Sequence, residues 1–233
     1  MDNKVLFSRV CNFTNFSGIK KDILSIEEKL NESWNISDES DLSHYDSMEY
    51  VLVAYISYVR YSKSYIKMVA NVIGNEKIDN MLDYGAGIGA TTLLASELFN
   101  ASCYYLNLKG KQWDFAETIL QNDKCKMIDN IGVLNGTDLI WCLDLFEHIR
   151  EPIALLKNLL SLRPKYLITS NSFAPRAYGH FSTFIVDNTS VDCSKIGRVF
   201  NRYMKESGYV TDERCKHPNF WNTRPRIWKR IDV

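Results

Sequence analysis

The chain has 233 residues, 45% of them hydrophobic, and its lysines and arginines equal its aspartates and glutamates at 28 each. This length and composition suit one domain of ordinary size with an added subdomain. The balanced charge gives no strong field toward nucleic acid or anionic lipid, and no apolar run is long enough to span a bilayer. The first residues carry charges without an apolar signal region, so we expect a cytoplasmic protein.

Residues 1–78 show helical patterns and no strand signal, with a polar, turn-prone break at 35–41 between two amphipathic stretches. We expect them to form a helical subdomain that serves as a lid on the substrate side. In the second stretch, aromatic and aliphatic side chains recur at helical steps and predict a core-facing stripe of Val51, Tyr55, Tyr58, Tyr65 and Val69.

From residue 79 onward, short apolar runs alternate with helical segments, which is typical of successive βαβ units. We therefore predict an α/β fold, a Rossmann-like seven-stranded, mostly parallel sheet with helices on both faces. The last strand is expected to have one face toward the core and one toward solvent, because two sets of residues alternate in it: Ile227, Lys229, Ile231 and Val233, and Trp228, Arg230 and Asp232. The expected strands are 81–84, 103–108, 126–128, 139–143, 166–169 and two near the C-terminus, and the expected helices are 90–99, 111–121, 153–162 and 194–207.

A glycine-rich turn follows the first strand. Asp83 ends that strand, and Gly85, Gly87 and Gly89 follow at alternate positions before a helix begins. Such a turn lets the backbone approach a ligand closely, because no Cβ atom interferes. The pattern predicts a nucleoside cofactor, although Gly85, Gly87 and Ala90 also satisfy the looser dinucleotide fingerprint.

The segment 81–89, Met-Leu-Asp-Tyr-Gly-Ala-Gly-Ile-Gly, resembles the first motif of class I methyltransferases that use S-adenosylmethionine (SAM). The resemblance implies that Asp83 holds the methionine end of SAM, directly or through water. It also implies that Gly85, Ala86 and Gly87 present backbone to the cofactor, and that 79–233 is the SAM-binding domain.

Two further segments are similar to the same family. Asn107 and Leu108 end the second strand, where the family usually has an acid for the ribose hydroxyls, and an asparagine offers only one acceptor oxygen there. The segment 138–152 is similar to a strand that runs into an acid, a Glu-His pair and a proline-started helix. By this resemblance, Leu143 and Asp144 lie beside the sulfonium of SAM.

The adenine site is assigned to the end of the third strand. At Asp129 and Asn130 the family commonly uses a side-chain acceptor for the adenine amino group, and Asp129 is our choice. Together the three similar segments cover about residues 81–170, so the helical segment and the C-terminal part match the family only in general architecture.

Methyl transfer to a hydroxyl or an amine needs alignment, exclusion of water and removal of a proton. His148 and His180 follow predicted strands and are the candidate bases; His180 resembles a histidine in an acceptor-facing loop of several small-molecule methyltransferases. The competing interpretations are a helix-capping role for His148 and a loop-structuring role for His180. A metal-dependent variant would draw on Asp144, Glu147 and His148, but we expect a site without a metal.

We therefore predict a SAM-dependent methyltransferase, producing S-adenosylhomocysteine, that acts on an oxygen or nitrogen of a small polar acceptor. The basic and aromatic segment 216–230 is either a solvated hairpin or a binding region for a phosphate-bearing acceptor, such as a nucleotide-linked sugar. A nucleic-acid acceptor is less favoured than a small molecule, because the total charge of the chain is balanced. The alternatives are a non-catalytic methyltransferase-like partner subunit and an NAD-dependent oxidoreductase.

Overall fold

The N-terminal part of the chain is helical. The computed structural model describes residues 1–34, 43–73, 76–174, 178–212 and 225–232, so the expected polar break at 35–41 lies outside the described residues. Its elements are α1 (Asn3–Thr14), α2 (Lys20–Trp34), the 3-10 turn η1 (Ser43–Tyr45), α3 (Met48–Ser57), the π-helical turn η2 (Tyr58–Ser62) and α4 (Lys63–Ile73).

A seven-stranded sheet follows, and its strand order is β3-β2-β1-β4-β5-β9-β8. Strands β1 to β5 are parallel, whereas β9 is antiparallel to both β5 and β8. The order reverses between β1 and β4, which is where open α/β sheets bind ligands. The strands are β1 (Asn80–Tyr84), β2 (Ser102–Leu106), β3 (Cys125–Met127), β4 (Leu139–Leu143), β5 (Tyr166–Ser170), β8 (Tyr209–Thr211) and β9 (Arg226–Arg230).

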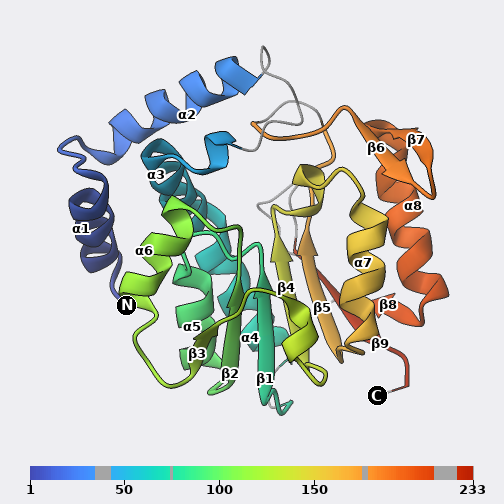
Figure 1. Cartoon of the computed structure of the whole chain (residues 1–233). Coiled ribbons are helices and arrows are strands. Elements are labelled where there is room, and N and C mark those ends of the chain that lie inside the picture. The colour runs from blue at the N-terminus through green and yellow to red at the C-terminus, as the bar shows by residue number, and fades with distance from the viewer. Residues whose placement is uncertain (35–42, 74–75, 175–177, 213–224, 233) are drawn as a thin grey trace.

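Helices cover both faces of the sheet, as predicted (Figure 1). One face packs against α5 (Ala90–Leu98), α6 (Lys111–Ile119) and the N-terminal helices, and the other packs against α7 (Pro152–Ser161) and α8 (Cys193–Glu206). Because both faces are covered, the central strands are largely buried, and β4 is apolar at all of its residues and buried at four of the five. The Rossmann-like fold prediction is confirmed.

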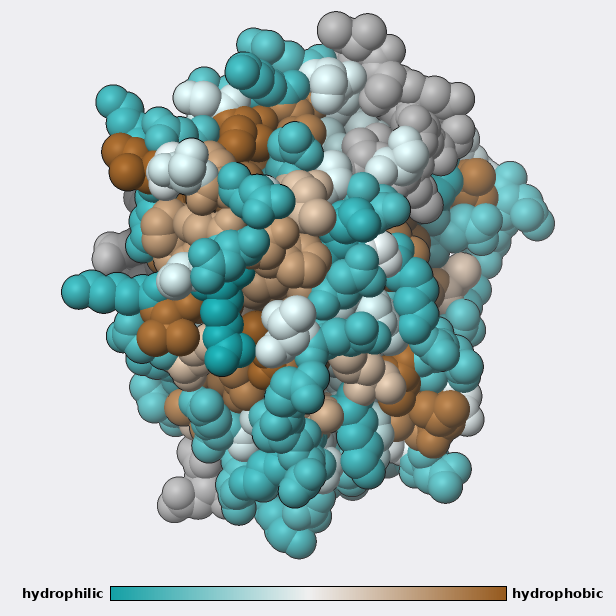
Figure 2. Space-filling model, turned by 60° about the vertical axis from the view of Figure 1, so that its left-hand side comes forward, coloured by the Kyte–Doolittle hydropathy of each residue, from teal (hydrophilic) through white to brown (hydrophobic). Residues whose placement is uncertain are grey.

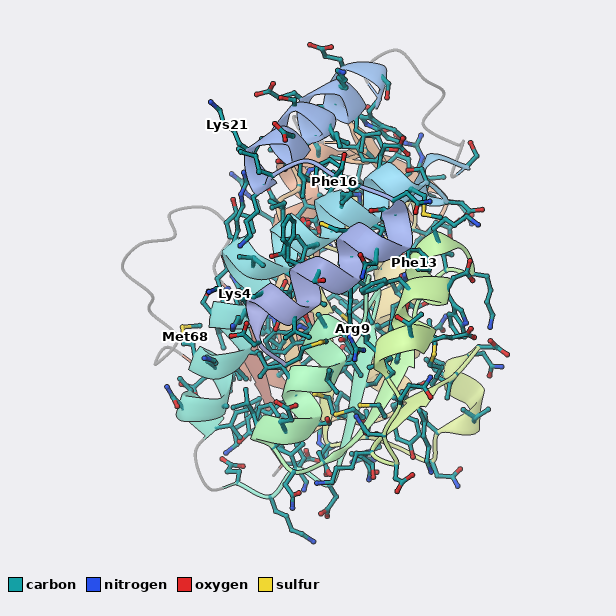
Figure 3. The ribbon with its side chains drawn as sticks, turned by 90° about the vertical axis from the view of Figure 1, so that its left-hand side faces the viewer. Lys4, Arg9, Phe13, Phe16, Lys21 and Met68 are labelled. Carbon is teal, nitrogen blue, oxygen red and sulfur yellow. The ribbon has the colours of Figure 1, made fainter. Side chains whose placement is uncertain are left out.

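The N-terminal helices share the core of the first face. The predicted stripe is confirmed, since Val51, Tyr55, Tyr58, Tyr65 and Val69 are all buried. Helix α1, which carries Arg9 and Phe13, crosses the outside of this layer (Figure 3).

Side-chain contacts tie α1 to α6. The Arg9 guanidinium donates to the Thr118 carbonyl at 3.3 Å, and the Phe13 ring meets Phe115 edge-on at 5.4 Å between centroids. Helix α2 runs along α3 at the upper left of Figure 1. The division into domains at residue 78 stays a prediction.

Two details differ from the sequence-based expectation. The predicted one-sided alternation in the last strand is wrong, because Ile227 and Trp228 are both buried, on opposite faces of the sheet. The reason is that α8 covers the second face beside β9. In addition, β6 (Thr183–Val186) and β7 (Thr189–Asp192) form a separate hairpin that the sequence analysis did not predict.

No helix among the described residues is long and apolar enough to cross a membrane. The face seen in Figure 2 is largely hydrophilic, with apolar residues gathered in its upper left part.

Gly89 sets how closely α5 approaches α6. It has a φ of +75°, and a Cβ atom there would lie 3.1 Å from the Ala116 Cβ and 3.2 Å from the Leu120 Cδ1. Gly208 has a similar φ of +83° but no atom within 4 Å of such a Cβ. The two glycines therefore separate the effect of backbone conformation from the effect of packing.

We predict that Gly89→Ala lowers the free energy of unfolding more than Gly208→Ala does. Both variants incur about 1–2 kcal/mol of left-handed strain. Only Gly89→Ala adds overpacking, which costs roughly 1–3 kcal/mol more. Urea denaturation of the two variants measures the difference, and equal losses would contradict this account of the α5–α6 contact.

Candidate functional site

A pocket of about 470 Å³ opens where the carboxyl ends of β1, β2 and β4 meet. Ligand pockets typically enclose about 300–1,000 Å³, so this one is large enough for a nucleoside cofactor. Most sequence-predicted cofactor residues line it: Asp83, Gly85, Ala86, Gly87, Asn107, Leu108, Asp129, Leu143 and Asp144.

The glycine turn is tied to the end of β2. The carbonyl of Gly87 accepts from the Tyr105 hydroxyl at 2.8 Å and from the Asn107 Nδ2 at 3.4 Å. The Gly85 amide donates to the Leu106 carbonyl at 2.8 Å. A Cβ atom at Gly87 would meet only the Gln112 Oε1, at 3.7 Å, so this residue faces the open pocket.

Asn107 is oriented by two acceptors. Its Nδ2 donates to the Gln112 Oε1 at 3.0 Å in addition to the Gly87 carbonyl. The donor side of the amide is therefore occupied within the protein. Its Oδ1 is the atom that can accept a hydrogen bond from a ligand hydroxyl.

Asp83 lines the pocket and is only 2% exposed. The Thr92 hydroxyl donates to its Oδ2 at 2.7 Å. Burial raises the pKa of Asp83 to about 7, and the Thr92 hydrogen bond opposes this rise only in part. A positively charged ligand group would favour the ionised carboxylate.

Of the two predicted adenine-binding residues after β3, Asp129 and Asn130, only Asp129 lines the pocket. Asp129 lines the pocket, but its exposed carboxylate forms an ion pair with the Lys109 Nζ at 2.6 Å. The Lys109 Nζ also lies 3.3 Å from the centroid of the Trp113 ring. Asn130 lies outside the lining, and its side chain caps the 3-10 turn η3 (Ile131–Val133) by accepting from the Gly132 amide at 2.9 Å.

The two predicted histidines meet at the other end of the pocket. The rings of His148 and His180 are edge-on, 4.8 Å apart between centroids. His148 lines the pocket with Asp144, whose Oδ1 is 4.0 Å from the His148 Nε2. His180 is buried behind His148, outside the lining of the pocket as the described residues define it.

Asp144 and Glu147 bring two carboxyl groups to this end. Asp144 follows β4 directly with a φ of +52°, and Glu147 lies in the 3-10 turn η4 (Phe146–His148). Left-handed backbone at a residue other than glycine is strained and clusters at functional sites. Burial raises the pKa of Glu147 to about 8, helped by the negative charge of Asp144. Burial also lowers the pKa of His148 to about 4, although Asp144 opposes that shift.

The N-terminal segment contributes residues that the sequence analysis missed. Tyr45 and Tyr50 line the pocket, and the Tyr45 hydroxyl is 3.0 Å from the His148 Nδ1. Asp46 accepts from the Lys111 amide at 2.8 Å and so binds the start of α6. In the sequence, Tyr45, Asp46 and Tyr50 are marked only by their position after the polar break. That position does not indicate which part of the fold they contact.

Comparisons with solved structures place the fold. The chain aligns over 99% of its length with 98% of magnesium protoporphyrin IX methyltransferase from Synechocystis PCC 6803, at 17% identity and a TM-score of 0.56. It also resembles the CMeT domain of the citrinin polyketide synthase, with 11% identity and a TM-score of 0.64, over 88% of this chain and 65% of that chain.

A third likeness is to the small RNA methyltransferase HEN1, with 15% identity and a TM-score of 0.55, over 74% of this chain. The chain spans only 25% of the length of that enzyme. No protein-family model matches the sequence, and a search of curated proteins gives no match either. The chain has the fold of class I methyltransferases.

We predict that Asp83 makes the fold less stable as the pH rises. Its pKa is about 7 in the folded protein and 3.8 when unperturbed, so between these values the native state holds a proton that the unfolded chain has lost. The stability that this proton provides is present below pH 4 and is lost as the pH rises through 7.

Urea unfolding at pH 5 and pH 8 tests this prediction. The Asp83→Asn variant should gain roughly 2–3 kcal/mol relative to the wild type over that interval, at about 1.4 kcal/mol per pH unit of unequal protonation. Asp123→Asn, which changes an exposed acid, should show no such gain. Parallel pH dependence in the wild type and the Asp83→Asn variant would contradict the raised pKa.

Proposed function

Starting from the class I methyltransferase fold, we propose that this protein is an enzyme that binds SAM in the pocket and transfers its methyl group to a small polar acceptor. The observation that carries the proposal is the convergence of the glycine turn, Asn107 and Asp83 on one pocket at the point where the strand order reverses. Each of these groups meets a different part of the cofactor.

The adenosine part would lie over the glycine turn. Gly87 leaves room for it, and the Asn107 Oδ1 accepts from a ribose hydroxyl. Leu108 and Asp129 border the pocket on the adenine side, where Asp129 would exchange part of its ion pair with Lys109 for the adenine amino group. Asn130 is a weaker adenine contact than Asp129 in this proposal, because its side-chain oxygen already caps a turn.

The methionine part would extend toward Asp83. A buried carboxylate with a single hydroxyl partner gains a strong, charge-assisted hydrogen bond when a ligand ammonium reaches it, directly or through water. Leu143 and Asp144 then flank the sulfonium, so that the methyl group faces His148. SAM supplies the electrophilic methyl group when it is bound.

The acceptor end is the cluster of Asp144, His148 and His180. The His180 Nδ1 lies 2.8 Å from the Ala174 carbonyl, and a carbonyl can only accept, so the lone pair of this ring is on Nε2. We assign His148 and His180 as the side chains that act on the acceptor, whose methylated atom is an oxygen or a nitrogen. Tyr45 and Tyr50 would exclude water from this end.

A phosphate-bearing acceptor is the narrower form of the proposal. It depends on segment 216–230, of which residues 216–224 lie outside the described part. The basic residues of β9 have partners within the protein: Arg226 donates to Asn201 at 2.7 Å, and Lys229 pairs with Glu76 at 3.4 Å. A small polar acceptor is therefore the better-supported statement, and the balanced charge disfavours nucleic acid.

Calorimetric titration with SAM, S-adenosylhomocysteine and NAD tests the cofactor. We expect micromolar binding of SAM and its product, and loss of at least a hundredfold in affinity in Gly87→Arg, because the new side chain would fill the pocket. Gly208→Arg is the matched control, since it adds the same side chain at a similar left-handed glycine with open space. Binding of NAD in place of SAM would support an oxidoreductase instead.

We predict that Asn107→Ala weakens SAM binding about tenfold. The variant removes one acceptor for the ribose, and a hydrogen bond of this kind contributes about 0.5–1.5 kcal/mol. The same titration measures the effect. Unchanged affinity would show that Asn107 does not hold the ribose. Binding without turnover on any small polar acceptor would favour the partner-subunit alternative.

A further inference from the structure

Asp144, His148 and His180 form a cluster of metal-ligating groups. One potential ligand atom from each side chain lies within 4.8 Å of the other two. Ligands at about 2.1 Å from a common ion are themselves roughly 3 Å apart, so a contraction of an ångström or two would close the cluster around an ion. The three side chains come from the end of β4, from η4 and from the loop after β5.

Both histidines are oriented as metal ligands usually are. The His180 Nδ1 donates to the Ala174 carbonyl, and the His148 Nδ1 lies 3.0 Å from the Tyr45 hydroxyl. In metal sites, a carbonyl, carboxylate or similar partner commonly holds the second ring nitrogen and so fixes the tautomer of a ligating histidine. The His180 ring thus keeps its Nε2 lone pair, and the His148 Nε2, which faces Asp144, keeps its lone pair when the His148 Nδ1 donates to the Tyr45 hydroxyl.

Glu147 provides an independent indication that this cluster suits a cation. It is fully buried, and its Oε1 accepts from the Ser172 amide at 2.5 Å. Its Oε2 is also buried and has no hydrogen-bond partner among the described residues. A buried carboxylate oxygen without a partner is costly, and a second carboxyl group, that of Asp144, belongs to the same cluster. One cation beside both carboxylates would compensate them together.

The surrounding backbone is built closely around this cluster. Gly179 has a φ of +76°, and a Cβ atom there would lie 1.9 Å from the Tyr45 hydroxyl and 2.5 Å from the His148 Nδ1. The Trp34 Nε1 donates to the His180 carbonyl at 3.3 Å, so α2 fixes the loop from outside. The ligands are thus held in position by supporting contacts, which is what a metal site requires.

We propose that Asp144, Glu147, His148 and His180 bind one divalent first-row transition-metal ion at the acceptor end of the pocket. Two imidazole nitrogens and two carboxylate oxygens suit ions from Mn²⁺ to Zn²⁺, whereas Mg²⁺ and Ca²⁺ prefer oxygen alone. Asp144 and His148 line the pocket, so the ion would keep open positions toward a ligand there. This revises the sequence-based expectation of a site without a metal.

The position of the ion also narrows the acceptor, and this step rests on the proposed function. An ion beside the methyl group would bind and orient an acceptor oxygen and make its hydroxyl more acidic. The lone pairs of His148 and His180 would then serve the ion, so the acidified hydroxyl would give its proton to solvent water at the mouth of the pocket before its oxygen takes the methyl group. An oxygen acceptor is therefore favoured over a nitrogen acceptor.

Titration of the full-length, chelator-treated protein with MnCl2 tests the site, with the electron paramagnetic resonance signal of free Mn²⁺ as the readout. CoCl2 and its visible absorption provide a second readout of nitrogen and oxygen ligation. We expect one ion per chain in the wild type, and at least tenfold weaker binding in Asp144→Asn and His180→Gln. The Asp144 side chain is 61% exposed, so that substitution leaves the fold intact even if a change at His180 does not.

Glu151→Gln is the matched control, because it removes an exposed acid from the same segment outside the cluster and should leave metal binding unchanged. The proposal is overturned if the wild type binds no ion at millimolar metal, or if Asp144→Asn binds the ion as well as the wild type does. The metal titration contains no SAM, so a protein that binds no metal would not contradict the proposal that it binds SAM. A protein that binds no SAM would likewise not contradict the proposed metal site.

Discussion

The arrangement of the pocket depends on the hydrogen bonds that the Gly87 carbonyl accepts. This carbonyl accepts from both the Tyr105 hydroxyl and the Asn107 amide, and these two residues lie at the end of the neighbouring strand. The glycine turn is therefore fixed to β2 without using any side chain of its own. This leaves the turn open toward the pocket and at the same time determines the orientation of Asn107.

The second constraint is the closure of the opposite end by segments far apart in the sequence. Tyr45 from the N-terminal part and Gly179 from the loop after β5 both contact His148, and Asn31 of α2 accepts from the Tyr178 amide at 2.7 Å. The helical segment and the loop thus build one wall. It encloses Glu147 and the two histidines and leaves Asp144 exposed beside them, so ionisable groups and lone pairs are concentrated at the acceptor end of the pocket.

Much of the fold could be predicted because local patterns determine it. A sheet covered on both faces requires apolar strands, and Met81–Leu82 and Leu139–Leu143 are visible as such in the sequence. The glycine turn and Asn107 could also be located, because their function depends on spacing along the chain. The two-sided burial of Ile227 and Trp228 could not, since it depends on α8 packing beside a strand that is distant in the sequence.

The acceptor end shows the same limit. His148 and His180 were identified separately, but their edge-on contact depends on the loop after β5 folding back over η4. Tyr45 carries no motif at all, and only tertiary structure brings its hydroxyl to the His148 Nδ1. Contacts between distant segments leave no periodic signal, so the approach of His180 and Tyr45 to Asp144 and His148 could be recognised only in three dimensions.

The most direct measurement of the central claim is a crystal structure of the protein with S-adenosylhomocysteine. The account predicts the adenosine over Gly87, a ribose hydroxyl within hydrogen-bond distance of the Asn107 Oδ1, and the amino group of the ligand directed at Asp83. Ligand density in another part of the molecule, or adenosine bound with its ribose away from Asn107, would contradict it.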